Sequence, residues 1–403
     1  MRDALAAAAW LNTVMMLLGL CLLAVPALAP AIALDLGVST ELIGMYSALM
    51  WSASVVTSVC AGSMIRRYGA MRVSQACLAV GAFGMLLGSA GSLVFLALSA
   101  VFIGLGQGAE TPASSSLLVR ITPIPHRTVV LSIKQTGGQI GGMLAGLLFP
   151  ALAGFIGWRG ALFVMAVPMI ALVLVIELPR HKLDPPSKPL AHASHLEFPQ
   201  AVRLIVSDGR LRSLSISCML YVAVQVCQQA FLVSYLVAEC LLSLRAAGML
   251  LALAQVGGLF GRIFWGALAG HNAGKSGAIA TLIATGAGMA LCAFALGVWG
   301  SVLSLPVLGT LCFCFGTTSA GWVGVHIAET ARMVPAEAVG QVTGAMLVTG
   351  VAGLILGPLS FAALAAATSF GSAYCVSGLV AVLGALSLAF PFSTRKRPFG
   401  SAP

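Results

Sequence analysis

The stretch 179-PRHKLDPPSKPLAHASHLEFPQ-200 decides how this chain is organised. It is polar and rich in proline, lysine and histidine, whereas 59% of the 403 residues are hydrophobic and 8% are charged, with a mean hydropathy of +1.03. A soluble domain carries about 25% charged residues. Both flanks are therefore expected to lie in a membrane, with residues 179–212 as a solvated cytoplasmic linker. Its histidines are spread through a proline-broken stretch that contains no cysteine, so no metal site is predicted there.

Six apolar runs lie on each side of the linker, each long enough to cross a hydrocarbon core of about 30 Å as a helix. Backbone polar groups find no water in that core, so every run is predicted to be helical. The expected fold class is an all-α membrane protein with 12 transmembrane helices in two pseudo-symmetric six-helix bundles, residues 1–178 and 213–403, the second ending in a short basic tail. The runs are residues 11–34, 42–64, 73–91, 93–117, 129–155, 160–178, 213–237, 245–268, 276–297, 302–328, 339–365 and 369–391.

The net charge of +10 is distributed along the chain in a way that indicates membrane topology rather than nucleic-acid binding. With a cytoplasmic N-terminus, most lysines and arginines fall on inner loops, and only Arg159 and Arg245 fall on outer loops. Both termini are thus predicted to be cytoplasmic, in a multi-pass protein of the plasma membrane, which is the inner membrane in a bacterium. Arg2 and the following apolar run also resemble a signal peptide, but the run continues to Leu34, longer than a signal core.

The two halves are similar to each other in sequence. A shift of 212 residues superimposes arginines and glycines, and such self-similarity is typical of a duplicated transporter. The matches are Arg120 with Arg332, Gly138 with Gly350 and Gly141 with Gly353.

A loop motif then gives a family resemblance. The stretch Gly62–Arg72, GSMIRRYGAMR, resembles the G-x-L-A-D-R-x-G-R-K loop of the major facilitator superfamily, and the second half carries a partial copy from Gly266. The matching residues are Gly62, Arg67, Gly69 and Arg72, while Arg66 stands where the family has aspartate. The resemblance covers the whole chain. It implies a secondary transporter of two six-helix bundles in which these loop residues take part in conformational change.

Three charged residues stand out within the apolar runs, away from the ends of the runs: Glu110, Lys134 and Arg262. A charge at the centre of a spanning helix costs about 2.5–3.5 kcal/mol on insertion scales, so such residues are functional candidates. Lys134 and Arg262 lie at similar depths, roughly 8–9 Å from the inner end of their runs. In the superfamily fold these two helices pack across the seam between the bundles, so the resemblance implies that both cations face one space. Their repulsion favours an anion between them, either a substrate carboxylate or Glu110.

Each of these residues also has a second interpretation. Lys134 could extend to the lipid headgroups, Glu110 could form a fixed ion pair with Lys134 instead of carrying protons, and Arg262 could have a structural role. In favour of binding, GRIFWG at 261–266 is similar to the stretch in which monocarboxylate transporters and oxalate:formate exchangers place a substrate-binding arginine. Guanidinium suits a carboxylate through its planar paired donors.

Polar neighbours complete the predicted site. Closely spaced glycines around Gln135 and Gln139 allow another helix to approach this run. The residues assigned to substrate are Arg262, Lys134, Gln135, Gln139, Gln255 and Trp322, and Glu110 is assigned to proton coupling.

The sequence therefore predicts a secondary active transporter that moves a small organic anion, expected to be a carboxylate, by alternating access with proton coupling or exchange. The alternative is an efflux permease for apolar, drug-like compounds, and the third hypothesis is a non-transporting membrane sensor. The chain contains no GxSxG, HExxH or Walker A pattern and no CxxC among its ten cysteines, so no enzyme, cofactor or metal site is predicted. The expected partners are the organic anion, protons and the lipid bilayer, without nucleic acid, and the chain is expected to be a monomer.

Overall fold

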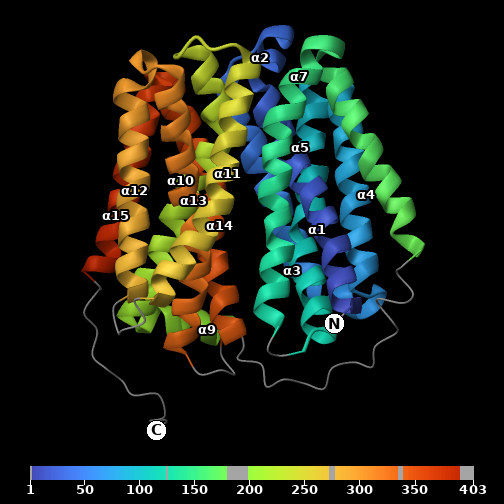
Figure 1. Cartoon of the computed structure of the whole chain (residues 1–403), viewed down its shortest axis with the longest axis vertical. Coiled ribbons are helices and arrows are strands. Elements are labelled where there is room, and N and C mark those ends of the chain that lie inside the picture. Colours follow the sequence, from blue (N-terminus) through green and yellow to red (C-terminus); the bar gives the residue numbers. More distant parts are fainter. Residues whose placement is uncertain (1, 124–125, 179–197, 272–276, 335–338, 391–403) are drawn as a thin grey trace.

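The computed structural model describes residues 2–123, 126–178, 198–271, 277–334 and 339–390. These residues form two groups of helices that stand side by side (Figure 1). The first group contains α1 (Arg2–Leu22), α2 (Ala24–Leu36), α3 (Ile43–Tyr68), α4 (Ala70–Ser89), α5 (Leu93–Gly108), α6 (Glu110–Ile121) and α7 (Arg127–Val175). The second contains α10 (Gly209–Ala238), α11 (Leu244–His271), α12 (Gly277–Trp299), α13 (Leu305–Met333), α14 (Val339–Ala367) and α15 (Phe370–Ala389). The three linker histidines and the basic tail lie outside the described residues.

Each of the twelve predicted runs falls largely within the helices of the described residues. Eleven helical segments of the described residues are long and apolar enough to span a membrane, and one of them, Val129–Val175, covers one predicted run and most of the next. Within it Gly157 adopts φ 71° and ψ 166°, which ends one span and begins the next. A left-handed φ of this kind favours glycine. The chain reverses direction at this point, as Figure 1 shows for α7.

Two spans are broken inside the membrane by proline. The ring of proline removes a hydrogen bond to the carbonyl four residues earlier and clashes with it. Accordingly α1 ends at Leu22, four residues before Pro26, and α5 ends at Gly108, four residues before Pro112. The second break places Glu110 at the first position of α6, in the interior of the first group.

The end of the linker differs from the prediction. Residues 198–212 were expected to be solvated linker, but Phe198–Ser207 forms a helix, α9, and α10 begins at Gly209. Asp208 explains the earlier start of α10, because its Oδ1 accepts hydrogen bonds from the backbone N–H groups of Arg210 and Leu211 at 2.8 and 3.0 Å. We call the side of the protein where α9 lies the linker side (Figure 1) and the opposite side the far side.

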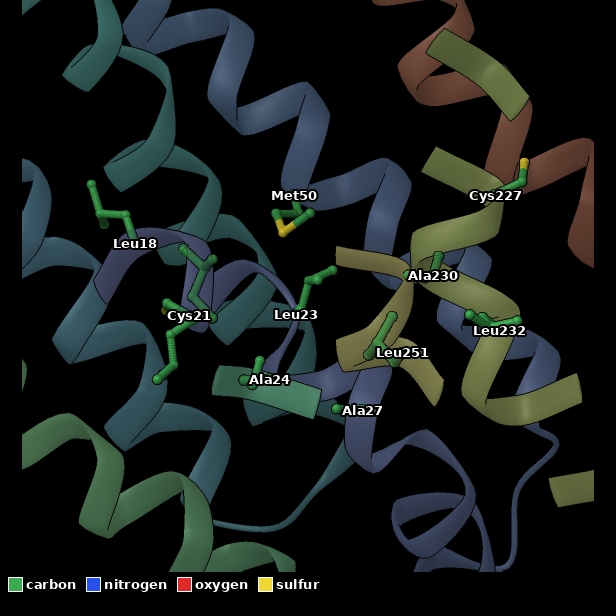
Figure 2. Close-up of a cluster of buried hydrophobic side chains, with 14 of the residues drawn as sticks. Leu18, Cys21, Leu23, Ala24, Ala27, Met50, Cys227, Ala230, Leu232 and Leu251 are labelled. Atoms are coloured by element: carbon green, nitrogen blue, oxygen red, sulfur yellow. The ribbon is translucent and has the colours of Figure 1, made fainter. Parts of the chain in front are cut away.

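The two groups share one apolar core. Buried side chains of α1 and α2 lie near those of α10 and α11, as Figure 2 shows for Leu23, Ala27, Ala230 and Leu251. Between the groups, α2 contacts α10, α3 contacts α14 and α7 contacts α11. The packing is apolar and close, as expected for helices in lipid.

Glycines allow the backbones to approach across this seam. A Cβ atom added to Gly146 of α7 would lie 2.6 Å from the carbonyl oxygen of Gly248 in α11, and one added to Gly44 of α3 would lie 2.6 Å from that of Pro358 in α14. No side chain fits at either position. On α7 and α11 these contacts continue from Gly146 and Gly248 toward the linker side as far as Gln139 and Gly258.

Candidate functional site

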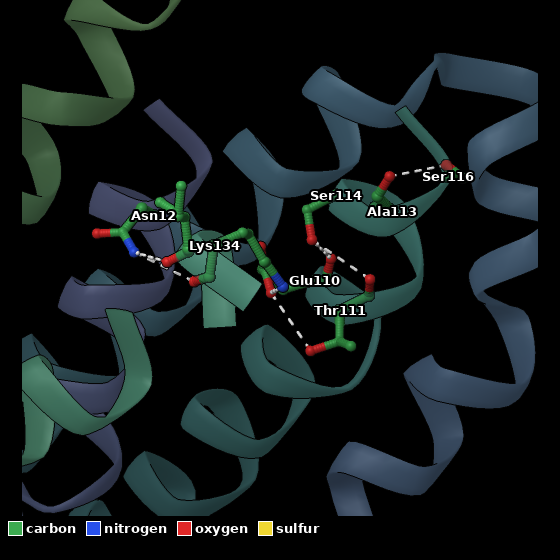
Figure 3. A network of polar contacts seen from close by, with 8 residues as sticks. Asn12, Glu110, Thr111, Ala113, Ser114, Ser116 and Lys134 are labelled. Carbon is green, nitrogen blue, oxygen red and sulfur yellow. Dashed lines mark hydrogen bonds and ion pairs between the residues drawn. The ribbon is translucent and has the colours of Figure 1, made fainter. Parts of the chain in front are cut away.

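Lys134 and Glu110 form a buried ion pair inside the first group (Figure 3). Lys134 Nζ lies 2.9 Å from Glu110 Oε2, and the relative exposures of the two side chains are 0% and 2%. Thr111 Oγ1 donates a longer hydrogen bond to the same oxygen at 3.4 Å, while Glu110 Oε1 is buried without a hydrogen-bond partner. The interpretation that Lys134 extends to lipid headgroups is therefore wrong, and the ion pair between Lys134 and Glu110 is confirmed.

Asn12 fixes the backbone that carries Lys134. Its Nδ2 donates to the carbonyl oxygens of Ile133 at 2.6 Å and Lys134 at 3.2 Å, and to Thr136 Oγ1 at 3.0 Å. The hydrogen bonds join α1 to α7, next to the ion pair that joins α7 to α6 (Figure 3). The partners of Asn12 could not be read from the sequence, because contacts between helices more than 120 residues apart leave no local pattern.

Arg262, in contrast to Lys134, has no counter-charge among the described residues. No hydrogen bond or ion pair from a described residue reaches its guanidinium, and its Nε is buried without a partner. The side chain as a whole is half-buried, in the linker-side part of α11. An ionised group inside a spanning helix that lacks a protein partner requires another source of negative charge or of hydrogen-bond acceptors.

Helical periodicity shows which face of α11 carries Arg262. Gln255 and Gly258 contact Gly142 and Gln139 of α7, so these positions mark the face of α11 directed at the first group. Arg262 follows Gln255 by seven residues, which is nearly two full turns, and therefore lies on the same face. It stands about 10 Å nearer the linker side than the contact between Gln255 and Gly142.

The same reasoning applied to α7 separates Gln135 from Lys134. Gln135 precedes Gly142 by seven residues and shares its face, toward α11. Lys134 is turned by about 100° from that face, toward Glu110. Gln135 is half-buried, as Arg262 is. The expectation that Lys134 and Arg262 face one space is thus corrected: the residue of α7 placed opposite Arg262 is Gln135.

The remaining predicted substrate residues divide between the seam and the second group. Gln139 and Gln255 lie at the seam, with exposures of 6% and 4%, and Gln139 Oε1 has no hydrogen-bond partner. Trp322 packs inside the second group, where its ring contacts Tyr221 and His326 edge-on. Its Nε1 donates to Ser319 O of its own helix at 2.9 Å, so its hydrogen-bonding group is already used.

The loop-motif residues lie at the linker-side ends of their helices. Gly69 has φ 86° between α3 and α4, a conformation that favours glycine. Arg72 bonds Glu177 at 2.8 Å, which ties the start of α4 to the end of α7. Gly62 and Arg67 are exposed, and a Cβ atom added to Gly266 would meet no atom of another element within 4 Å.

Two packed groups of membrane-spanning helices, with an unpaired cation on the face between them, are typical of a membrane transporter. The family profile of the Major Facilitator Superfamily matches residues 9–358. The chain belongs to this superfamily, so the prediction of a multi-pass transporter rather than an enzyme is confirmed.

Comparisons with known proteins give transporters throughout. The chain is 30% identical over 135 residues to the probable anion transporter 3, chloroplastic, of Arabidopsis thaliana, covering 32% of this chain and 26% of that protein. It is 26% identical to two proteins of Acinetobacter baylyi: the cis,cis-muconate transport protein, covering 35% of this chain and 34% of that one, and the 4-hydroxybenzoate transporter PcaK, covering 37% and 33%. The chain thus matches about a quarter to a third of the length of these relatives.

Solved structures share the fold over nearly the whole chain. A bacterial homolog of the human lysosomal transporter Spinster, in an inward-facing and occupied conformation, superimposes with a TM-score of 0.72 at 15% identity, covering 95% of this chain and 94% of that one. The nucleoside transporter NupG superimposes with a TM-score of 0.77, also at 15% identity, covering 95% and 99%.

Proposed function

We propose that this protein is a secondary transporter that carries a small organic anion, and that Arg262 binds the anionic group. The observation that carries this proposal is the unpartnered guanidinium inside the membrane, on the face of α11 that looks across the seam. A carboxylate supplies both the charge and the paired acceptors that a guanidinium binds best. Gln135, across the seam, adds an amide that can orient the ligand.

The relatives support an anionic substrate. One is named for anions, and the other two are named for cis,cis-muconate and 4-hydroxybenzoate, which both bear carboxylates. These names differ in the number of carboxylates, so they support the class of substrate without selecting a member of it.

Alternating access fits the arrangement of the seam. The contacts of α7 with α11 extend from the far side to Gln139 and Gly258, and the half-buried Gln135 and Arg262 follow on the linker side. We infer that the substrate reaches Arg262 from the linker side in this conformation, which is the cytoplasm if both termini are cytoplasmic. Rocking of the two groups would then open the contacts between α7 and α11 and expose the same site to the far side.

Glu110 remains our candidate for proton coupling. A proton bound to Glu110 would neutralise the carboxylate and leave Lys134 without its counter-charge, which disfavours the buried pair. Such a change would loosen the contact between α6 and α7, and α7 also carries the seam residues. Coupling by exchange of a second anion would leave the pair intact throughout the cycle.

The experiment that tests the proposed function is uptake of labelled carboxylates by purified protein in liposomes. We expect uptake that is lost in Arg262→Ala and retained in Arg245→Ala, because Arg245 is an exposed arginine at the start of the same helix. Efflux of apolar dyes is measured in parallel. Dye efflux without carboxylate uptake, unchanged by Arg262→Ala, would replace the anion transporter by a permease for apolar compounds.

A further inference from the structure

The number of positive charges at the seam that have no protein counter-charge indicates how many negative charges the substrate carries. Among the described residues, two cations lie more than one helical turn from both ends of a spanning helix: Lys134 and Arg262. For Lys134 the span is the part of α7 that ends at the Gly157 break. Lys134 is cancelled by Glu110 at 2.9 Å. One positive charge, that of Arg262, is left for a ligand.

The three glutamines placed on the facing sides of α7 and α11 bring no charge. Gln135, Gln139 and Gln255 carry amides, which donate and accept hydrogen bonds but stay neutral. An amide N–H can bond a carboxylate oxygen, yet the full negative charge then remains in a surrounding of low dielectric constant, where an uncompensated charge is strongly disfavoured.

While Glu110 is ionised, Lys134 cannot supply the missing charge to a second carboxylate. Its side chain is fully buried and turned toward Glu110, about 100° from the face that carries Gln135. Drawing it away would leave Glu110 buried and ionised without a partner, and breaking a buried pair in this way is strongly unfavourable.

From this charge count we propose that the transported anion carries a single negative charge, and that the site rejects a second carboxylate on the same molecule. This inference rests on the proposed function, because it takes Arg262 as the anion ligand. The Glu110–Lys134 pair then contributes to specificity. Because Glu110 neutralises Lys134, only Arg262 remains to compensate a negative charge on the substrate.

The test compares acids that share a carbon skeleton. The melting temperature of the purified full chain is measured at pH 7.5 over a concentration series of sorbate and trans,trans-muconate, and of benzoate and terephthalate. In each pair the second acid has one additional carboxylate. We expect the monocarboxylate to stabilise the protein at concentrations at least tenfold lower than its dicarboxylate partner.

The possible results separate this inference from the proposed function. Dicarboxylates that stabilise as well as the monocarboxylates, or better, would overturn the single-charge inference and leave an anion transporter. Absence of stabilisation by all four acids would overturn the proposed function, and the inference with it.

A charge added at the seam gives an independent measurement. Gln135→Lys places a second cation on the face of α7 opposite Arg262, and we expect it to reduce the preference for monocarboxylates at least tenfold. Gln135→Met, which has a similar length and no charge, removes the orienting amide, so binding of both acids should weaken while the ratio between their affinities stays that of the natural protein. Equal preference in both variants would contradict the charge count. The comparison of the four acids on the unchanged protein does not depend on whether either variant folds.

Discussion

Lys134 and Arg262 are two cations inside the membrane that differ in their burial and in whether the protein supplies a counter-charge. Lys134, in the first group, is fully buried and bound to Glu110 at 2.9 Å. Arg262, in the second group, is half-buried and has no bonding partner among the described residues. The depth of a charge in a span therefore does not by itself mark a binding residue. What distinguishes them is whether the protein already supplies the counter-charge.

The contrast continues when the two halves are compared position by position. The shift of 212 residues places Trp322 at the position of Glu110 and Met346 at that of Lys134. Both are buried, and Trp322 contacts aromatic rings instead of a charge. The second half thus fills the equivalent place with apolar side chains. Since apolar residues suffice for packing there, the ion pair of the first half is a candidate for function and not only for stability.

The largest effect on stability is expected from breaking the ion pair. Glu110→Gln removes the charge that compensates Lys134, and stranding one partner of a buried pair costs about 3–5 kcal/mol. We expect a clear fall in the melting temperature of the purified protein. The double variant Glu110→Leu with Lys134→Met, which imitates the apolar second half, should recover most of it. A single variant as stable as the natural protein would show that the pair is not maintained.

Arg262 should show the reverse pattern, with a large effect on binding and a small one on stability. A hydrogen bond to a charged group contributes about 1.5–3 kcal/mol, so Arg262→Ala should weaken anion binding roughly tenfold to a hundredfold. Arg262→Lys should restore part of the affinity, because it returns the charge without the planar paired donors. Affinity is read from the concentration dependence of thermal stabilisation. A large loss of stability in the ligand-free variant would instead support a structural role for Arg262.

The seam between the groups predicts an intermediate effect. Gly146→Ala places a methyl group against the backbone of Gly248, and overpacking of this kind costs about 1–3 kcal/mol. We expect the contact of α7 with α11 to weaken, seen as faster hydrogen exchange of their far-side segments. Gly154→Ala on the same helix is the matched control, because nothing lies within 4 Å of its added Cβ. Equal exchange in both variants would mean that the close approach is not needed to hold the far side closed.

The smallest effect is expected from an ion pair at the membrane edge. Arg159 and Asp35 lie 2.8 Å apart, almost as close as Lys134 and Glu110, but their side chains are 47% and 41% exposed. Solvent screening limits such a pair to less than about 1 kcal/mol. Arg159→Gln should therefore change the melting temperature far less than Glu110→Gln. Similar effects of the two substitutions would show that burial is not what makes the inner pair important.

Much of the fold could be predicted from the sequence, because the hydrocarbon core imposes a length and a polarity on each span. Proline and glycine also explain local breaks, as at Pro112 and Gly157. The helix α9 could not be found in this way, since its ten residues, FPQAVRLIVS, form a short amphipathic helix outside the apolar runs. The helix α10 begins at Gly209, four residues before its predicted start, because the polar residue Asp208 caps it.

The candidate site could be predicted in composition but not in arrangement. Hydropathy alone identifies Glu110, Lys134 and Arg262 as charges inside spans. Which of them meet depends on a rotation of about 100° between Lys134 and Gln135 around α7, and on the break that places Glu110 at the start of α6. The spacing of residues along one helix predicts neither the rotation nor the break, because the residues that meet belong to different helices.

The central claim is that Arg262, and not Lys134, holds the charge of the substrate. Its most direct test is binding of a labelled monocarboxylate to three purified proteins: the natural chain, Arg262→Ala, and the double variant Glu110→Leu with Lys134→Met. We predict binding by the natural chain and the double variant and its loss in Arg262→Ala. Binding that survives Arg262→Ala but disappears in the double variant would contradict the claim and place the anion at Lys134.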